Sequence, residues 1–95
     1  MSDVPRAERS VQIVNRAGLH ARPAAVLVKL AGMFGSEVRL EKDGLEVNGK
    51  SIMGVLMLAA DRGSTLRISA TGPDAQAAVD ALCGLVGEGF GEMDG

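Results

Sequence analysis

Four short segments of the chain alternate apolar and polar residues, which is the pattern of β-strands with one buried face. They span residues 10–13, 37–41, 45–47 and 65–70. Such alternation is typical of an antiparallel sheet that is covered on one side and wet on the other. Asp43 and Gly44 separate the second segment from the third. Because both residues tolerate a positive φ, Asp-Gly favours a two-residue turn, and we predict a hairpin here.

Three longer stretches repeat apolar residues at helical spacing, and they predict helices over residues 21–31, 52–59 and 74–86. Gly32 follows the first of these helices and is expected to end it. The predicted order of elements along the chain is therefore β-α-β-β-α-β-α.

The residues around the two later helices carry signals of their own. Ser51 is expected to cap the second helix through its side chain. Pro73 is expected in the first turn of the third helix, with the Asp74 carboxylate near the positive end of its dipole. Cys83 falls within the apolar stripe of this helix, so we interpret it as an unreactive core or boundary residue.

Together these elements predict an α+β fold. The helices are amphipathic and one face of the sheet is exposed to solvent. The expected packing is therefore a two-layer open-faced β-sandwich, in which three helices cover one face of a four-stranded antiparallel sheet. A chain of 95 residues fits one such domain. We expect the domain to span residues 9–87, between a flexible N-terminal extension over residues 1–8 and a flexible acidic tail over residues 88–95.

Composition and charge argue against several classes of function. The net charge is −2, and the chain has no Trp or Tyr and only two Phe, which disfavours nucleic-acid binding. The single cysteine excludes an internal disulfide, and no His, Cys or acid cluster has metal-ligand spacing, so no metal or cofactor is expected. Residues 1–9 lack the apolar stretch of a signal peptide, and residues 55–60, the longest apolar run, fall far short of the ~20 that span a bilayer. We expect a monomeric, cytoplasmic protein.

The candidate chemistry centres on His20, the only histidine, which falls where the first strand gives way to the first helix. Pro23 is tolerated only in the first turn of a helix, so the helix begins within a residue or two of His20. Unpaired N–H groups and the positive dipole end at such a start favour a phosphate and disfavour an imidazolium, leaving a neutral, nucleophilic ring. The Arg22 guanidinium can grip phosphate oxygens, and Gly18 lets the preceding loop bend.

The residues alone leave the role of His20 open. A lone histidine at a helix start is most often an exposed residue without a task, and His20 has no nearby acid for a Ser-His-Asp triad. One alternative is a ferredoxin-like ligand-sensing or interaction module in which His20 is not phosphorylated. Another is a small hydrolase such as an acylphosphatase, which would need an Arg-Asn pairing that the sequence does not place. In the remaining interpretation, His20 is a lone nucleophile that acts together with a partner protein.

Two motifs resemble the signatures of HPr phosphocarrier proteins of the phosphoenolpyruvate-dependent phosphotransferase system. Residues 18–24, GLHARPA, resemble the active-site signature of this family, and residues 49–55, GKSIMGV, resemble its regulatory-serine signature. Both occur in the expected order and spacing, and the resemblance covers residues 9–87. The resemblance implies a phosphocarrier without independent turnover.

The resemblance also implies the roles of individual residues. His20 would accept a phosphoryl group on Nδ1 from enzyme I, which phosphoenolpyruvate charges, and pass it to a histidine or cysteine of an enzyme II domain such as enzyme IIA. Arg22 would assist the transfer, and Ala21 and Arg22 would hold the phosphate. Ser51 would be a regulatory phosphorylation site, served by an HPr kinase/phosphorylase where one is present.

The second predicted helix also suggests a docking surface. Ile52, Met53, Leu56 and Met57 are more apolar side chains than one face of a two-turn helix can bury. An exposed apolar patch on a small protein indicates an interaction site, and methionine adapts to several partners. The predicted partner interface comprises Ala25, Lys29, Ile52, Met53 and Leu56.

Within the family, two branches remain open. Residues 71–73, TGP, and the glycine-rich acidic stretch after Val86 resemble carriers of the nitrogen-related regulatory branch. Residues 50–54, KSIMG, are shared with carriers of the sugar-transport branch and with kinase-regulated carriers. The sequence also assigns no role to its N-terminal extension.

Overall fold

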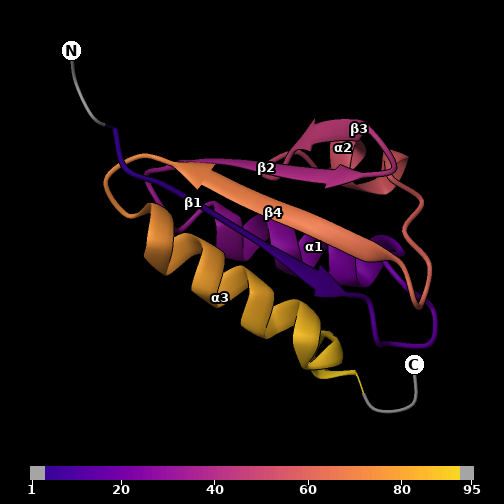
Figure 1. Cartoon of the computed structure of the whole chain (residues 1–95). Coiled ribbons are helices and arrows are strands. Elements are labelled where there is room, and N and C mark those ends of the chain that lie inside the picture. The colour runs from indigo at the N-terminus through magenta and orange to yellow at the C-terminus, as the bar shows by residue number, and fades with distance from the viewer. Residues whose placement is uncertain (1–3, 93–95) are drawn as a thin grey trace.

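The computed structural model describes residues 4–92 of the chain. Seven helices and strands follow in the predicted order, and a short 3₁₀ turn, η1, comes after the last helix (Figure 1). Their bounds are β1 (Arg6–Gln12), α1 (Ala21–Ala31), β2 (Glu37–Lys42), β3 (Leu45–Asn48), α2 (Ile52–Met57), β4 (Thr65–Thr71), α3 (Ala75–Gly87) and η1 (Gly89–Gly91).

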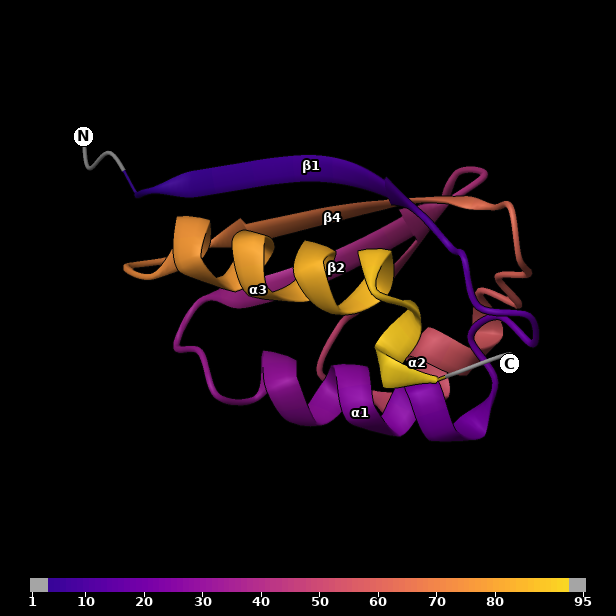
Figure 2. The same ribbon diagram turned by 90° about the horizontal axis from the view of Figure 1, so that it is seen from below.

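The four strands form one antiparallel sheet in the order β1-β4-β2-β3. Helices α1 and α3 lie side by side against one face of this sheet, and α2 packs against α1 and β3 (Figures 1 and 2). Within residues 4–92, no helix covers the other face of the sheet. This arrangement confirms the predicted two-layer open-faced β-sandwich.

The buried faces of the elements match the sequence pattern. In β4, Leu66, Ile68 and Ala70 are buried, whereas Thr65 and Arg67 between them are exposed. Full burial of a leucine or isoleucine side chain contributes about 1.5–3 kcal/mol, so alternation of this kind fixes which face meets the helices. The helices supply the matching buried stripes, made of Ala24, Leu27, Ala31, Ala78, Val79, Leu82, Cys83 and Val86.

The predicted hairpin joins β2 and β3 through a two-residue turn. Lys42 pairs with Leu45 across it. Asp43 has φ 51° and Gly44 has φ 87°, the positive values that such a turn requires. The hairpin prediction is therefore confirmed.

The start of α2 and the end of α1 lie where the sequence predicts them, whereas the end of α2 and the conformation of Gly32 differ from the prediction. Ser51 caps α2, because its Oγ accepts a hydrogen bond of 3.1 Å from the Gly54 amide. α2 ends at Met57, two residues before the predicted end, and Ala59 beyond it has φ 48°, outside the helical region. α1 ends before Gly32 as predicted, but Gly32 keeps a right-handed φ of −66° and so is not a left-handed cap.

The start of α3 corrects the prediction for Pro73, whereas Asp74 lies at the positive end of the helix as predicted. Pro73 lies outside the helix, whose first residue is Ala75, and Asp74 is the N-cap without a side-chain capping hydrogen bond. The Asp74 carboxylate instead accepts hydrogen bonds of 2.9 Å from the amides of Gly35 and Ser36, and one of 2.5 Å from the Ser36 hydroxyl. It therefore ties α3 to the loop between α1 and β2, because the two backbone amides offer better-placed donors than its own helix.

The fold extends beyond the predicted limits of residues 9–87 at both ends. β1 begins at Arg6, and Ala7 pairs with Ala70 and is buried. After α3, Phe90 is buried in the core cluster. Residues 1–3 of the predicted extension and residues 93–95 of the predicted tail lie outside the described residues. The sequence pattern missed the start of β1 because an edge strand with one small buried residue there, Ala7, has almost no apolar alternation.

Candidate functional site

His20 is the N-cap residue of α1. Its backbone is extended, with φ −80° and ψ −171°, and its carbonyl accepts the first helical hydrogen bond, 3.0 Å from the Ala24 amide. The imidazole makes no capping hydrogen bond to the helix, and 42% of the side chain is exposed. The fold thus holds the backbone of His20 firmly while leaving its ring at the surface.

The loop before His20 is held by a close backbone contact. The Leu19 amide donates a hydrogen bond of 2.8 Å to the Ala60 carbonyl, and Gly18, with φ 69°, packs against the same carbonyl. A side chain at Gly18 would overlap that carbonyl oxygen and would also force an unfavourable φ. Gly18 therefore does more than permit a bend, because it lets two loops meet beside the histidine.

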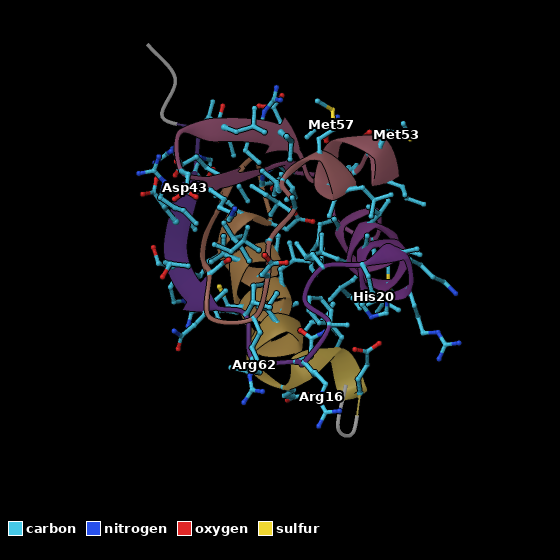
Figure 3. The ribbon with its side chains drawn as sticks, turned by 90° about the vertical axis from the view of Figure 1, so that its right-hand side faces the viewer. Arg16, His20, Asp43, Met53, Met57 and Arg62 are labelled. Atoms are coloured by element: carbon cyan, nitrogen blue, oxygen red, sulfur yellow. The ribbon has the colours of Figure 1, made fainter. Side chains whose placement is uncertain are left out.

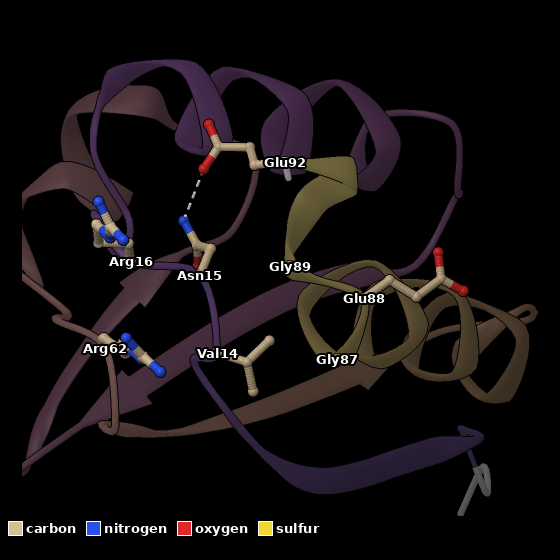
Figure 4. Close-up of a pocket in the computed structure, with 8 residues that line it drawn as sticks. All are labelled: Val14, Asn15, Arg16, Arg62, Gly87, Glu88, Gly89 and Glu92. Carbon is tan, nitrogen blue, oxygen red and sulfur yellow. Dashed lines mark hydrogen bonds between the residues drawn. The ribbon is translucent and has the colours of Figure 1, made fainter. Parts of the chain in front are cut away.

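Two side chains that the sequence did not point to, Glu92 and Asn15, lie next to each other, and Glu92 also lies next to His20. Oε2 of Glu92 lies 3.2 Å from Nε2 of His20. Oε1 of the same carboxylate accepts a hydrogen bond of 2.9 Å from Nδ2 of Asn15, which Figure 4 shows as a dashed line. Asn15 and Glu92 are 77 positions apart in the sequence, so no local pattern could have paired them.

The first turn of α1 offers free donors next to the ring. The first N–H groups of a helix have no partner within it, and Pro23 has none to offer. In the described part of the chain, the amides of Ala21 and Arg22 are in no hydrogen bond. Both residues are exposed, and no ion pair of Arg22 occurs among residues 4–92. The first turn of α1 therefore carries two amides without a hydrogen bond in the described range, and the exposed Arg22 follows His20 by two positions.

Helix α2 presents apolar side chains to solvent, as its composition predicted. Val55 is its one fully buried residue, whereas Met53 is 73% and Met57 66% exposed. Ile52 and Leu56 are exposed as well, and we name these four exposed residues the α2 patch. Figure 3 shows Met53 and Met57 on the same side of the molecule as His20. Ala25 and Lys29, the interface residues predicted on α1, are also exposed.

A cavity of about 400 Å³ opens beside Glu92 (Figure 4). Its lining includes Arg16 and Arg62 from two loops, and Glu88 from the end of α3. Asn15 is buried at its edge, and its Oδ1 has no hydrogen-bond partner among the described atoms. The two arginines and two glutamates balance in charge, so the cavity favours neither anions nor cations. His20 does not line it.

Within residues 4–92, no group of three or more His, Cys, Asp or Glu side chains is placed to hold a metal ion. None of the helices in this range combines the length and the apolar character needed to cross a membrane.

Known proteins are similar to this chain in sequence and in fold. A family model described as the PTS HPr component phosphorylation site matches residues 7–88. The phosphocarrier protein HPr of Cupriavidus necator is 51% identical over 85 residues, covering 90% of this chain and 96% of that protein. The HPr-like protein Crh of Halalkalibacterium halodurans is 46% identical, covering 83% and 94% respectively. The crystal structure of HPr-C-His from Thermoanaerobacter tengcongensis matches with a TM-score of 0.88 at 44% identity, covering 92% of this chain and 98% of that one.

The fold, together with these similarities in sequence, places the chain in the class of phosphocarrier proteins. The chain belongs to the HPr family of the phosphotransferase system. It is a carrier component, not an enzyme with turnover of its own. The resemblance found in residues 18–24 and 49–55 is thereby confirmed at the level of the family.

Proposed function

We propose that His20 accepts a phosphoryl group from phosphorylated enzyme I and donates it to an enzyme II domain such as enzyme IIA. The observation that carries this proposal is the position of the only histidine in the chain, half-exposed at the start of α1 with no capping hydrogen bond. A ring in that position can approach the phosphorus atom of a partner without first breaking a contact with its own helix.

The first turn of α1 supplies what the transferred group needs. Its oxygens carry negative charge, and the free amides of Ala21 and Arg22 lie at the positive end of the helix dipole. The Arg22 guanidinium adds a permanent positive charge and directional donors. These groups stabilise the phosphoryl group both during transfer and on the phosphorylated carrier.

The partners dock, in this proposal, on the α2 patch together with Ala25 and Lys29. The patch is apolar, exposed and on the same side of the molecule as His20 (Figure 3). A shared docking surface next to the histidine lets one carrier meet a donor and an acceptor in turn. We place this exchange in the cytoplasm and expect the carrier to be a monomer.

Ser51 is the proposed regulatory site, and an HPr kinase/phosphorylase is the proposed modifying enzyme. Its Oγ caps α2 beside Ile52, at the edge of the α2 patch, and the side chain is partly exposed. A phosphate there would add about −1.5 to −2 charge at neutral pH, within reach of any partner that docks on α2.

The test is incubation of the protein with enzyme I and labelled phosphoenolpyruvate. We expect an acid-labile, base-stable phosphoprotein, and no label on His20→Ala. The variant should keep the parent melting temperature within about 2 °C, since a half-exposed side chain without helix contacts adds little stability. Label on His20→Ala would overturn the assignment. Offering purified enzyme IIA domains of the sugar and nitrogen branches to the labelled protein then shows which branch accepts.

A further inference from the structure

The contact between Glu92 and His20 is built by the fold and does not depend on a mobile surface pair. The Glu92 side chain is only 14% exposed. After α3, η1 turns the chain toward α1 (Figure 2). Within η1, Phe90 is buried and adopts a φ of 61°, and Glu92 follows η1 directly. A non-glycine residue takes such a φ only where the surroundings enforce it.

Asn15 fixes which way the Glu92 carboxylate is held. Asn15 is buried, and its Nδ2 donates one hydrogen bond to the Gly18 carbonyl and another to Oε1 of Glu92, each of 2.9 Å. The Gly18 carbonyl can only accept, so it dictates that the amino group of Asn15, and not its oxygen, faces this side. Oε1 is therefore engaged by Asn15, and Oε2 is left facing Nε2 of His20 at 3.2 Å.

This geometry determines where the imidazole proton resides. A carboxylate oxygen has only lone pairs to offer, and a second lone pair on Nε2 at that distance would be repelled. Nε2 therefore carries the proton in the neutral ring, and Nδ1 is left with the free lone pair. The N–H partner of one ring nitrogen commonly decides the role of the other in this way.

We propose that Glu92 is a positioning residue for phosphoryl transfer, which holds the Nε2 proton of His20 and makes Nδ1 the nucleophile. The proposal rests on the function proposed above and adds to it the residue that selects the reacting nitrogen. Asn15 orients Glu92 in turn, so that a buried amide, a carboxylate and the imidazole form one connected chain.

The transfer step balances without movement of the Nε2 proton. The Nδ1 lone pair forms a bond to phosphorus as the donor's N–P bond breaks, and the donor nitrogen keeps the electron pair of that bond. The ring of His20 then carries a positive charge, with Nδ1 bound to phosphorus and Nε2 still protonated. The Glu92 carboxylate stabilises this charge as it develops, as a buried aspartate does for the histidine of a serine-protease triad.

Substitution of the glutamate by its amide provides the sharpest test. In Glu92→Gln, the Asn15 amino group still requires an oxygen opposite it, so the new NH₂ group must face Nε2 of His20. Nε2 then has to accept, and the ring proton moves to Nδ1. Glu92→Ala removes the partner and lets the ring relax to the tautomers of free histidine. Glu88→Gln is the matched control, because Glu88 lines the same cavity but does not contact His20.

The measurement is ¹⁵N NMR of the histidine ring at a pH where it is neutral. The chain has one histidine, so histidine labelling gives one signal for each ring nitrogen. We expect protonated Nε2 in the parent and in Glu88→Gln, a shift toward protonated Nδ1 in Glu92→Gln, and shifts near those of free histidine in Glu92→Ala. Ring shifts in Glu92→Gln and Glu92→Ala that match the parent would overturn the proposal.

The transfer rate gives a second, independent readout. For a half-exposed charge pair, loss of the carboxylate should slow labelling by enzyme I about fivefold in Glu92→Ala, and by about tenfold or more in Glu92→Gln, where the tautomer is also wrong. Equal labelling rates in the parent, Glu92→Ala and Glu92→Gln would contradict the role of Glu92 in transfer, even if the ¹⁵N shifts of the ring changed. If the parent is not labelled at all, the proposed function fails, whereas the NMR result stands by itself.

Discussion

At the scale of single residues, the histidine is supported from two sides that do different work. Helix α1 supplies free amides and the positive end of its dipole, which in our proposal hold the phosphoryl oxygens. Glu92 faces Nε2, the ring nitrogen that does not react in the proposed transfer. In this proposal the amides stabilise the incoming group, and the Glu92 carboxylate stabilises the charge that the ring would acquire.

Arg22 is the residue whose contribution can be separated most cleanly. Arg22→Ala should keep the fold, since the side chain is exposed, and should slow phosphoryl transfer about tenfold because a positive charge near the transition state is lost. Rapid-quench labelling with enzyme I measures this. Arg62→Ala is the control, since Arg62 is also exposed but lies in the loop before β4. A parent-like rate for Arg22→Ala would remove Arg22 from the site.

At the scale of elements, α2 exposes most of its apolar side chains to solvent. Of its six residues, only Val55 is fully buried, so most of its apolar surface has no partner within residues 4–92. A helix this short gains little stability by itself. Its position is secured by the Ser51 cap and by packing against α1 and β3.

Met53→Glu should weaken docking to enzyme I by about tenfold or more, with little change in stability. The side chain is 73% exposed, so the fold loses little, whereas a carboxylate in an apolar interface is costly to desolvate. Titration calorimetry against enzyme I measures the affinity. Met33→Glu is the control, because Met33 is equally exposed but follows the far end of α1. Affinity equal to the parent would exclude Met53 from the interface.

Ser51→Asp should slow phosphorylation of His20 without loss of stability. Aspartate is a good N-cap and so preserves the role of the hydroxyl that accepts from Gly54, but it adds one negative charge at the edge of the α2 patch. Ser51→Ala should accept phosphate at the parent rate and lose about 0.5–2 kcal/mol of stability with its cap. Labelling rates and unfolding curves for the parent, Ser51→Asp and Ser51→Ala show whether Ser51 regulates transfer or only caps α2. If Ser51→Asp is labelled as fast as Ser51→Ala, Ser51 is only a cap.

At the scale of the whole molecule, Asp74 connects parts of the chain that no strand or helix joins. Its carboxylate binds the loop before β2 while its backbone begins α3. Ser36, its hydroxyl partner, is fully buried. The hydrogen bonds from the Ser36 hydroxyl and the Gly35 amide hold the pKa of the Asp74 carboxyl below its ordinary value.

That lowered pKa predicts how stability depends on pH. A carboxyl whose pKa is lower in the folded than in the unfolded chain stabilises the fold fully above the unfolded value, which is about 3.9. This contribution is lost as the pH falls through the lower, folded value. Asp74→Asn should therefore be less stable than the parent at pH 7, with the difference shrinking in acid.

Denaturant unfolding of the parent and Asp74→Asn at pH 7 and near pH 2.5 tests this. Asp61→Asn is the control, since Asp61 is exposed and its carboxylate is in no ion pair within the described range. The Asp61→Asn difference from the parent should be small at both pH values. A gap between parent and Asp74→Asn that stays constant with pH would show that ionisation of Asp74 does not matter.

The sequence by itself determined the features that depend on neighbours along the chain. Alternation in residues 65–70, the turn at Asp43 and Gly44, the cap at Ser51 and the placement of His20 before Pro23 all rest on local geometry. These features were enough for the fold, the two motifs and the candidate nucleophile. Tertiary structure alone decided which distant side chains meet. Glu92 reaches His20 only because Phe90 is buried and turns the chain back, and Asp74 turns away from its own helix only because the Gly35 and Ser36 amides lie opposite. Such contacts follow from how elements pack, and no local periodicity records them.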